Sequence, residues 1–250
     1  MATQQQKKFN ILLLGDICTD VYQYGTIDRL SPEAPVPVFV PTWQENRSGM
    51  AGNVCSNLEA LGCAVSMITG EPSTKTRLID ERSKQHIARI DEDIKSVPIR
   101  FETAIPTTYD AIVISDYAKG SVDYTLIEDI LNEVKCPVFI DTKLSDLERM
   151  QGAWVKINEL EYSKIKSECS GLIVTKGSKG AEVPHHEISC TAEQVEVVDV
   201  TGAGDTFLAA LTYQFLNTKD IQAAVKFAIK ASSITVQHLG VYAPTLKEIV

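Results

Sequence analysis

Short runs of apolar residues recur along the chain and are separated by segments whose apolar positions have helical spacing. Most of the runs are continuous rather than alternating, which is typical of parallel strands covered on both faces. Because strands that alternate with helices join through right-handed crossovers, the pattern predicts a layered α/β sandwich. We expect strands over Ile11–Leu14, Val36–Val40, Val65–Thr69, Ala111–Ser115, Val138–Asp141, Leu172–Thr175 and Val195–Val198.

Four segments between these runs have the spacing of amphipathic helices. Gly62 follows the first of them and is a typical helix stop. Asp123 precedes the second and is expected to cap its N-terminus. The four predicted helices are Asn53–Leu61, Tyr124–Val134, Ala203–Phe215 and Ile221–Val236.

Two segments depart from this alternation, at about 22–42 and 85–101. The first has four prolines and the strand-like VPVFV, and the second has the alternating pattern of an exposed strand. Such excursions suit a small sheet that closes over a site as a lid, and they equally suit plain surface hairpins. No linker or internal repeat is visible, so residues 1–250 are expected to form a single domain.

Composition excludes some functions. The net charge is −9 and the pI about 5.0, which disfavours binding to nucleic acids or anionic membranes. No apolar run is long enough to span a bilayer, and the opening MATQQQKKFN has no apolar core of a secretory signal. The six cysteines form no CxxC pair and are expected to be reduced packing residues of a cytoplasmic protein.

The segment DVTGAGDTF, which ends at Phe207, carries the clearest chemistry. Gly202 and Gly204 allow a tight turn whose N–H groups start a helix, where the dipole favours anions. Asp205 would stand beside a phosphate held there and could take the proton of an attacking hydroxyl. A GAG turn also occurs as a purely structural element, and the three residues alone do not separate these readings.

The longer string decides between them, because DVTGAGDTF resembles the DTTGAGDxF signature of the ribokinase family, the PfkB carbohydrate kinases. The resemblance implies a ribokinase-like three-layer α/β sandwich with a mostly parallel central sheet and a small β lid. It implies ATP and Mg²⁺ as cofactors and Asp205 as the catalytic base. Gly202, Ala203 and Gly204 would supply the anion hole, with Thr201 on the nucleotide side.

Further motifs follow in the order that the family has them. In LGDICTD, Asp16 and Asp20 resemble the acidic residues that grip sugar hydroxyls, and Gly49 and Asn53 stand where the family closes over the sugar, with Met50 in place of a second glycine. NELE matches the family's NxxE motif, so Asn158 and Glu161 would organise Mg²⁺ and phosphates, with Glu161 reaching the metal through water. TKGSKG resembles the segment beside the nucleotide, which assigns Thr175 and Gly177 to it.

Three strings, DRLSPEAPVPV, ISDYAKG and DTK, look like the branch of D-glycero-β-D-manno-heptose 7-phosphate kinases. Those enzymes phosphorylate the anomeric hydroxyl on the route to ADP-heptose. A substrate that already carries a phosphate needs cations in its pocket. The residues proposed for this role are Arg29, Arg89, Lys119 and Lys143.

The chain is shorter than the family pattern after Gly70 and again between Thr175 and Val195. Besides the heptose kinase, a kinase for another sugar or sugar phosphate and a non-catalytic regulatory homologue stay open, although an intact Asp205 weighs against the latter. A Rossmann dehydrogenase is excluded, because no GxGxxG follows the first strand. The resemblance implies a small sugar or sugar phosphate as binding partner and would allow a homodimer formed through the lid.

Overall fold

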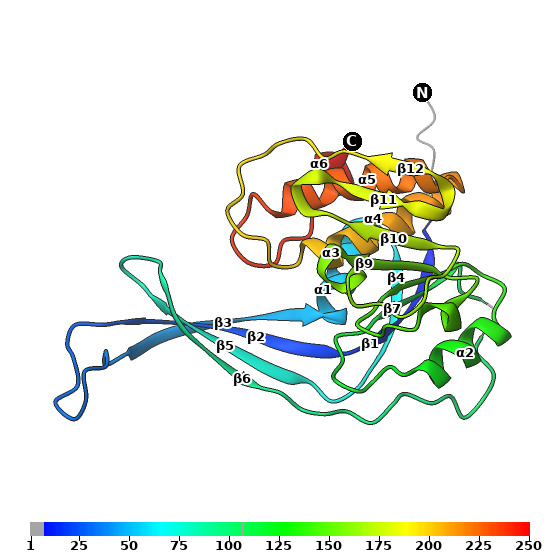
Figure 1. The fold of residues 1–250 in the computed structure, drawn as a ribbon. Coiled ribbons are helices and arrows are strands. Elements are labelled where there is room, and N and C mark those ends of the chain that lie inside the picture. The colour runs from blue at the N-terminus through cyan, green and yellow to red at the C-terminus, as the bar shows by residue number, and fades with distance from the viewer. Residues whose placement is uncertain (1–7, 107) are drawn as a thin grey trace.

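The buried apolar runs form one sheet, which makes up the body of the molecule (Figure 1). The computed structural model describes residues 8–106 and 108–250, so the first seven residues of the polar N-terminal tail lie outside the described residues. The strand order is β12-β11-β10-β9-β8-β7-β1-β4, parallel except for the pairs that involve β11 and β12. The bounds are β1 Asn10–Gly15, β4 Ala64–Thr69, β7 Ala111–Ser115, β8 Val138–Asp141, β9 Trp154–Asn158, β10 Leu172–Thr175, β11 Ala181–Val183 and β12 Ile188–Cys190.

Helices cover both faces of this sheet. Side chains alternate across a strand, so Ile11 and Leu13 of β1 pack in one cluster with α1, α4 and α5, while Leu12 and Leu14 pack in a second cluster with α2. The helices are α1 Ala51–Ala60, α2 Tyr124–Glu133, α3 Glu159–Tyr162, α4 Ala203–Thr218, α5 Ile221–Thr235 and α6 Leu246–Ile249, with 3-10 turns η1 Leu147–Met150, η2 Gly177–Lys179 and η3 Pro184–His186. The predicted three-layer α/β sandwich is confirmed.

Both predicted helix boundaries are confirmed. Gly62 follows α1 with φ +89°, a conformation that glycine adopts without strain. The Asp123 side chain caps α2 by accepting a hydrogen bond from Leu126 N at 2.9 Å. None of the helices in the described part of the chain is long and apolar enough to span a membrane. All six cysteines are free thiols.

A second sheet projects from the body as an arm (Figure 1). Its order is β3-β2-β5-β6. The strands extend beyond the two segments that the sequence singled out, since β2 begins near the end of β1 and β3 runs into α1. Their bounds are β2 Ile17–Thr26, β3 Val40–Met50, β5 Ser73–Asp80 and β6 His86–Glu92.

Two predicted strands are wrong. Val36–Val40 contributes only its last residue to β3, and the rest belongs to the loop at the tip of the arm, where Pro37 forms an isolated bridge with Leu30. Proline has no N–H to donate, so VPVFV cannot continue a ladder. Val195–Val198 is a connection whose Val198 N–H donates to Val236 O at 2.8 Å. After β4 the chain turns directly into β5, with no helix between them.

Candidate active site

Asp205 lies in the first turn of α4, at the edge of the body sheet where its parallel strands end, and is only 3% exposed. Its two carboxylate oxygens accept different hydrogen bonds: Oδ2 from Asn53 Nδ2 at 2.8 Å and Oδ1 from the Tyr117 hydroxyl at 2.6 Å. Burial raises the pKa of Asp205 to about 6, against the effect of these two hydrogen bonds. The side chain is therefore ionised at neutral pH and more basic than an ordinary aspartate.

The glycines before Asp205 are required by their neighbours. Gly202 is the N-cap of α4 with φ +78°, and a Cβ there would lie 2.6 Å from Asn53 Nδ2. A Cβ on Gly204 would lie 2.9 Å from Lys156 Nζ. The turn therefore brings the backbone into direct contact with two side chains. Ala203 N donates to Val200 O at 3.3 Å, and the N–H groups of the first helical turn are those that an anion can bind.

The loop after β7 carries Tyr117 toward Asp205, and Asp16 holds that loop in place. Asp16 is 1% exposed and its carboxylate accepts hydrogen bonds from the N–H groups of Tyr117, Lys119 and Ser121, at 2.8, 2.9 and 3.1 Å. Asp16 was predicted to bind sugar hydroxyls. Its observed contacts are to backbone N–H groups, so in this structure it fixes the loop that carries Tyr117.

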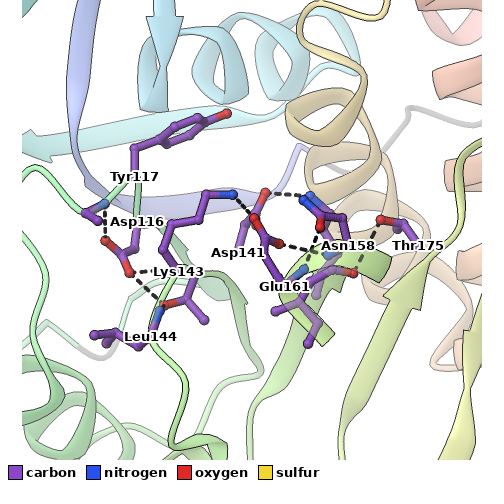
Figure 2. A network of polar contacts seen from close by, with 12 residues as sticks. Asp116, Tyr117, Asp141, Lys143, Leu144, Asn158, Glu161 and Thr175 are labelled. Carbon is purple, nitrogen blue, oxygen red and sulfur yellow. Dashed lines mark hydrogen bonds and ion pairs between the residues drawn. The ribbon is translucent and has the colours of Figure 1, made fainter. Parts of the chain in front are cut away.

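Asp116 fastens the same loop to the segment after β8 (Figure 2). Its carboxylate accepts hydrogen bonds from Ala118 N at 2.8 Å, from the Thr142 hydroxyl at 2.7 Å and from Lys143 N at 3.1 Å. Burial raises the pKa of Asp116, although these hydrogen bonds oppose the shift. The two loops that flank Asp205 are therefore held to each other through buried polar groups.

Lys143 and the NELE motif lie together (Figure 2), and Lys143 Nζ forms an ion pair with Glu161. Asn158 and Glu161 close a capping box on α3: Asn158 Oδ1 accepts from Glu161 N and Glu161 Oε2 accepts from Asn158 N, both at 2.8 Å. Lys143 Nζ also lies 5.5 Å from the centre of the Tyr117 ring. The motif and the predicted phosphate-binding lysine thus belong to one polar network beside Asp205.

A buried ion pair lies under the glycine turn. Lys156 Nζ donates to Asp141 Oδ2 at 2.5 Å, and the two residues are 5% and 4% exposed. They are neighbours across β8 and β9. The other oxygen, Asp141 Oδ1, has no hydrogen-bond partner among the described residues.

A pocket of about 260 Å³ opens beside the start of α4. Thr175 and Gly177, which the TKGSKG motif assigned to the nucleotide, line it together with Ala203 and Gly204 of the glycine turn. Thr201 is not part of its lining: its hydroxyl and N–H both bond to Asp199 Oδ1, at 2.7 and 3.0 Å. The apolar wall is made by Val195, Val197, Val200, Phe207, Ile229 and Val236. Such a cleft suits a flat aromatic ring at one end and phosphates at the other.

The arm contributes Asp20, which is 4% exposed and forms an ion pair with Arg77 of β5. Gly49 lies against it, since a Cβ there would be 2.3 Å from Asp20 Oδ2. Met50, at the position where the resemblance implied a second glycine, has a positive φ of 56° and is the N-cap of α1. The backbone therefore retains a glycine-like conformation although a side chain is present.

Three of the predicted substrate cations are held elsewhere. Arg29 belongs to the loop between β2 and β3, at the far end of the arm (Figure 1), so the structure does not bring it together with Asp205. The hairpin of β2 and β3 is long, and this carries its loop away from the body. Arg89 lies on the outer strand β6 and forms an ion pair with Asp91 at 2.7 Å. Lys119 forms an ion pair with Asp93 at 2.6 Å, so it does not share an anion with Lys143 here.

Sequence reasoning missed three residues of the site. Tyr117 was visible in ISDYAKG, a string that was read only for its lysine. Lys156 had a clear signal, because a lysine inside an apolar strand directly before NELE has to be paired with an anion. Arg77 had no signal, since only the pairing of β5 with β2 places it beside Asp20.

Solved structures define the class of fold. The ribokinase of Arabidopsis thaliana, solved with ribose and ATP, is 16% identical and superposes with a TM-score of 0.69 over 97% of this chain and 98% of that one. The ribokinase of Thermotoga maritima has the same TM-score at 15% identity, over 96% and 98% of the two chains. The fold is therefore ribokinase-like, as predicted.

Sequence comparisons define the family. The pfkB family carbohydrate kinase model matches residues 122–248, about half of the chain. The chain belongs to the PfkB family of carbohydrate kinases.

Among curated proteins, the Bifunctional protein HldE of Nitratiruptor sp. is 33% identical over 97% of this chain, and that of Campylobacter curvus 32% over 94%. The chain spans 64% and 63% of the lengths of these two relatives.

Proposed function

We propose that this protein transfers the γ-phosphoryl group of ATP to the anomeric hydroxyl of D-glycero-β-D-manno-heptose 7-phosphate. The observation that carries the transfer is the buried Asp205 carboxylate, with its raised pKa, beside the turn that ends the nucleotide pocket. The heptose assignment rests on DRLSPEAPVPV, ISDYAKG and DTK and on the position of Lys143 in the polar network. The similarity to HldE proteins over most of this chain supports it.

We assign a part to each group. The acceptor hydroxyl approaches Asp205, which takes its proton as the hydroxyl oxygen bonds to the γ-phosphorus. The bond from that phosphorus to the bridging oxygen breaks, and its electron pair stays on the ADP that leaves. The N–H groups at Gly202, Ala203 and Gly204 stabilise the charge on the transferring group.

Mg²⁺ fits this site only through phosphates and water. No three His, Cys, Asp or Glu side chains cluster as a metal site in residues 8–106 and 108–250. Asn158 and Glu161 already bond to each other's backbone, and Glu161 also holds Lys143. Direct coordination by either would break these contacts, so we assign Glu161 to waters of a Mg²⁺ ion that neutralises the ATP phosphates. We expect turnover to stop in excess chelator and to return with added Mg²⁺.

The phosphate already on the substrate needs a cation, and Lys143 is the best placed of the four predicted ones. Its side chain is 36% exposed, so it remains accessible while it bonds to Glu161. A charge-assisted contact is worth about 1.5–3 kcal/mol, or roughly 10–150-fold in affinity. We expect Lys143→Ala to raise KM for heptose 7-phosphate by a factor in this range and to change KM for an unphosphorylated sugar much less.

The test is an ATP-consumption assay with heptose 7-phosphate, fructose 6-phosphate, ribose and adenosine. The proposal requires the highest kcat/KM with heptose 7-phosphate. A preference for another acceptor would leave a kinase for a different sugar or sugar phosphate. No turnover with any acceptor, despite ATP binding, would favour a non-catalytic regulatory homologue, a role in which a base of raised pKa has no use.

We also propose that two copies pair through their arms. The arm exposes several large apolar side chains (Val40 52%, Trp43 46%, Ile87 36% and Ile90 51%). These side chains lie on the two outer strands of the arm, β3 and β6, and large exposed apolar patches are typical of interfaces. Light scattering should give twice the chain mass, and Ile90→Lys should reduce it to that of one chain. An unchanged dimer in this variant would place the interface elsewhere.

A further inference from the structure

Lys156 is a buried charged residue in the centre of the body sheet. It lies in β9 between the buried residues Val155 and Ile157 and is 5% exposed. Burying an ammonium group costs several kcal/mol unless its surroundings compensate for the lost water. An apolar side chain at this position would pack in the same strand without that cost.

The compensation that the described residues provide is partial. An ammonium group has three N–H donors, and one of them bonds to Asp141 Oδ2 at 2.5 Å. No other acceptor for Lys156 is found in the described part of the chain. Asp141 Oδ1 is buried and has no partner either. Both members of the pair also interact electrostatically with Asp205, but two donors of Lys156 and one oxygen of Asp141 lack hydrogen-bond partners among the described residues, which is unusual for buried charges.

The ammonium group also lies where a second positive feature begins. Lys156 Nζ is 2.9 Å from the position that a Cβ of Gly204 would take, in the first turn of α4. The N-terminus of a helix carries a partial positive charge, so a cation there is unfavourable by itself. Ala203 and Gly204 of the same turn line the pocket. An anion bound between the Lys156 ammonium group and the N-terminus of α4 would stabilise both of these positive features.

We propose that Lys156 is a catalytic residue whose ammonium group binds a non-bridging oxygen of the γ-phosphoryl group of ATP during transfer. This rests on the proposed kinase function and adds a third stabilising element to Asp205 and the glycine turn. Lys156 transfers no proton. While the acceptor oxygen bonds to phosphorus and the bond to ADP breaks, Lys156 shares its donors between Asp141 and the transferring group.

The competing explanation is that Lys156 only neutralises Asp141. The two explanations differ in nucleotide binding, because ATP has the γ-phosphate and ADP does not. The dissociation constants of ATP and ADP, each with Mg²⁺, are measured by calorimetry on the whole chain. The variants are Lys156→Met, Asp141→Asn, and both changes together. Arg149→Met, which breaks the surface ion pair with Glu128, is the matched control.

Removal of one partner of a buried pair is destabilising, whereas removal of both is often tolerated. The decisive variant is therefore the double one, Lys156→Met with Asp141→Asn, in which both charges are removed. Lys156→Met with Asp141→Leu is a second such neutral pair. We expect both neutral pairs to weaken ATP binding by roughly 10–150-fold relative to ADP. Asp141→Asn keeps the preference for ATP, because the ammonium remains. Arg149→Met leaves both constants unchanged.

Folded neutral pairs that retain the wild-type ratio of ATP to ADP affinity would overturn the proposal, and so would loss of the ratio in Asp141→Asn alone. Turnover is measured in parallel and should fall by at least the loss in ATP affinity. Because the nucleotide measurement needs no sugar, it distinguishes the two proposals. A wild-type protein that phosphorylates none of the acceptors, yet loses ATP preference without Lys156, would refute the kinase function and leave the lysine as a γ-phosphate ligand.

Discussion

The body and the arm contribute to the same site from sheets that are buried to very different degrees. In the body, every residue of β7 and β8 is buried, and these strands position Tyr117 and Lys143 through the loops that follow them. In the arm, every residue of β6 is exposed, and β2 alternates between buried and half-buried positions. Reacting groups have to be held within fractions of an ångström, which a doubly covered sheet provides.

The arm is less buried than the body. Its contribution, Asp20 with Arg77, is suited to gripping an acceptor rather than to transferring a phosphoryl group. The comparison therefore predicts a division of effects. Changes in the body should lower kcat, whereas changes in the arm should raise KM for the sugar.

The largest effect is expected at the base. Asp205→Asn keeps the shape of the side chain but removes the group that accepts the proton, and loss of a general base costs roughly 10²–10⁴-fold. We expect kcat to fall by this factor while ATP binding and the melting temperature stay near those of the wild type. Asp199→Asn is unsuitable as a control because Asp199 holds Thr201 and Gly240. Asp110→Asn is the better one, because Asp110 lies at the opposite end of β7, where it accepts a hydrogen bond from Asn10 N rather than from the segment next to the glycine turn. Activity within a factor of two of the wild type would remove Asp205 from the mechanism.

A change in the arm should have a smaller effect, and on KM rather than on kcat. Arg77→Met leaves Asp20 buried without its cation, and we expect KM for the sugar to rise by about 10-fold with kcat changed only a few-fold, since one charge-assisted hydrogen bond is lost. The melting temperature should fall as well, because an unpaired buried carboxylate is costly.

Arg82→Met removes an exposed arginine near the tip of the arm, whose pairing distance to Asp28 is 3.7 Å, and should leave both constants unchanged. A loss in kcat alone after Arg77→Met would contradict the division between body and arm.

The same contrast explains what the sequence could predict. β1 was predictable because Ile11–Leu14 are buried on both faces and so form a continuous apolar run. The glycine turn and Asp205 were predictable because the chemistry requires particular residues at fixed spacing. β9 was missed because Lys156 interrupts its apolar pattern, and the interruption is part of the site.

The pairing of strands that are distant in sequence could not be predicted. VPVFV and VEVV have strand-like composition, but their neighbours decide otherwise: prolines interrupt the first, and the second has no strand beside it, so that Val197 and Val198 are each 55% exposed. The arm was recognised as an excursion from the body, yet the membership of β5 depends on its parallel pairing with β2. Sequence pattern contains little information about which exposed strand pairs with which.

The smallest effect concerns pH and tests how the body tunes its base. Asp205 accepts a proton only when ionised, so kcat/KM should fall about tenfold per pH unit below a pKa of about 6 and should level off above it. Burial raises this pKa, and the hydrogen bond from Tyr117 lowers it because it stabilises the carboxylate. Tyr117→Phe removes that bond and should move the acidic limb of the profile to higher pH.

Tyr242→Phe is the matched control for this change, since the Tyr242 hydroxyl bonds to the Glu248 carboxylate at the same 2.6 Å on an exposed helix end. Its profile should coincide with that of the wild type. If Tyr117→Phe lowered kcat equally at every pH, Tyr117 would act by placing Asp205 or the acceptor rather than by tuning the pKa. A limb displaced only in Tyr117→Phe would show that the buried body sheet controls the basicity of Asp205 through the loop that Asp16 and Asp116 hold in place.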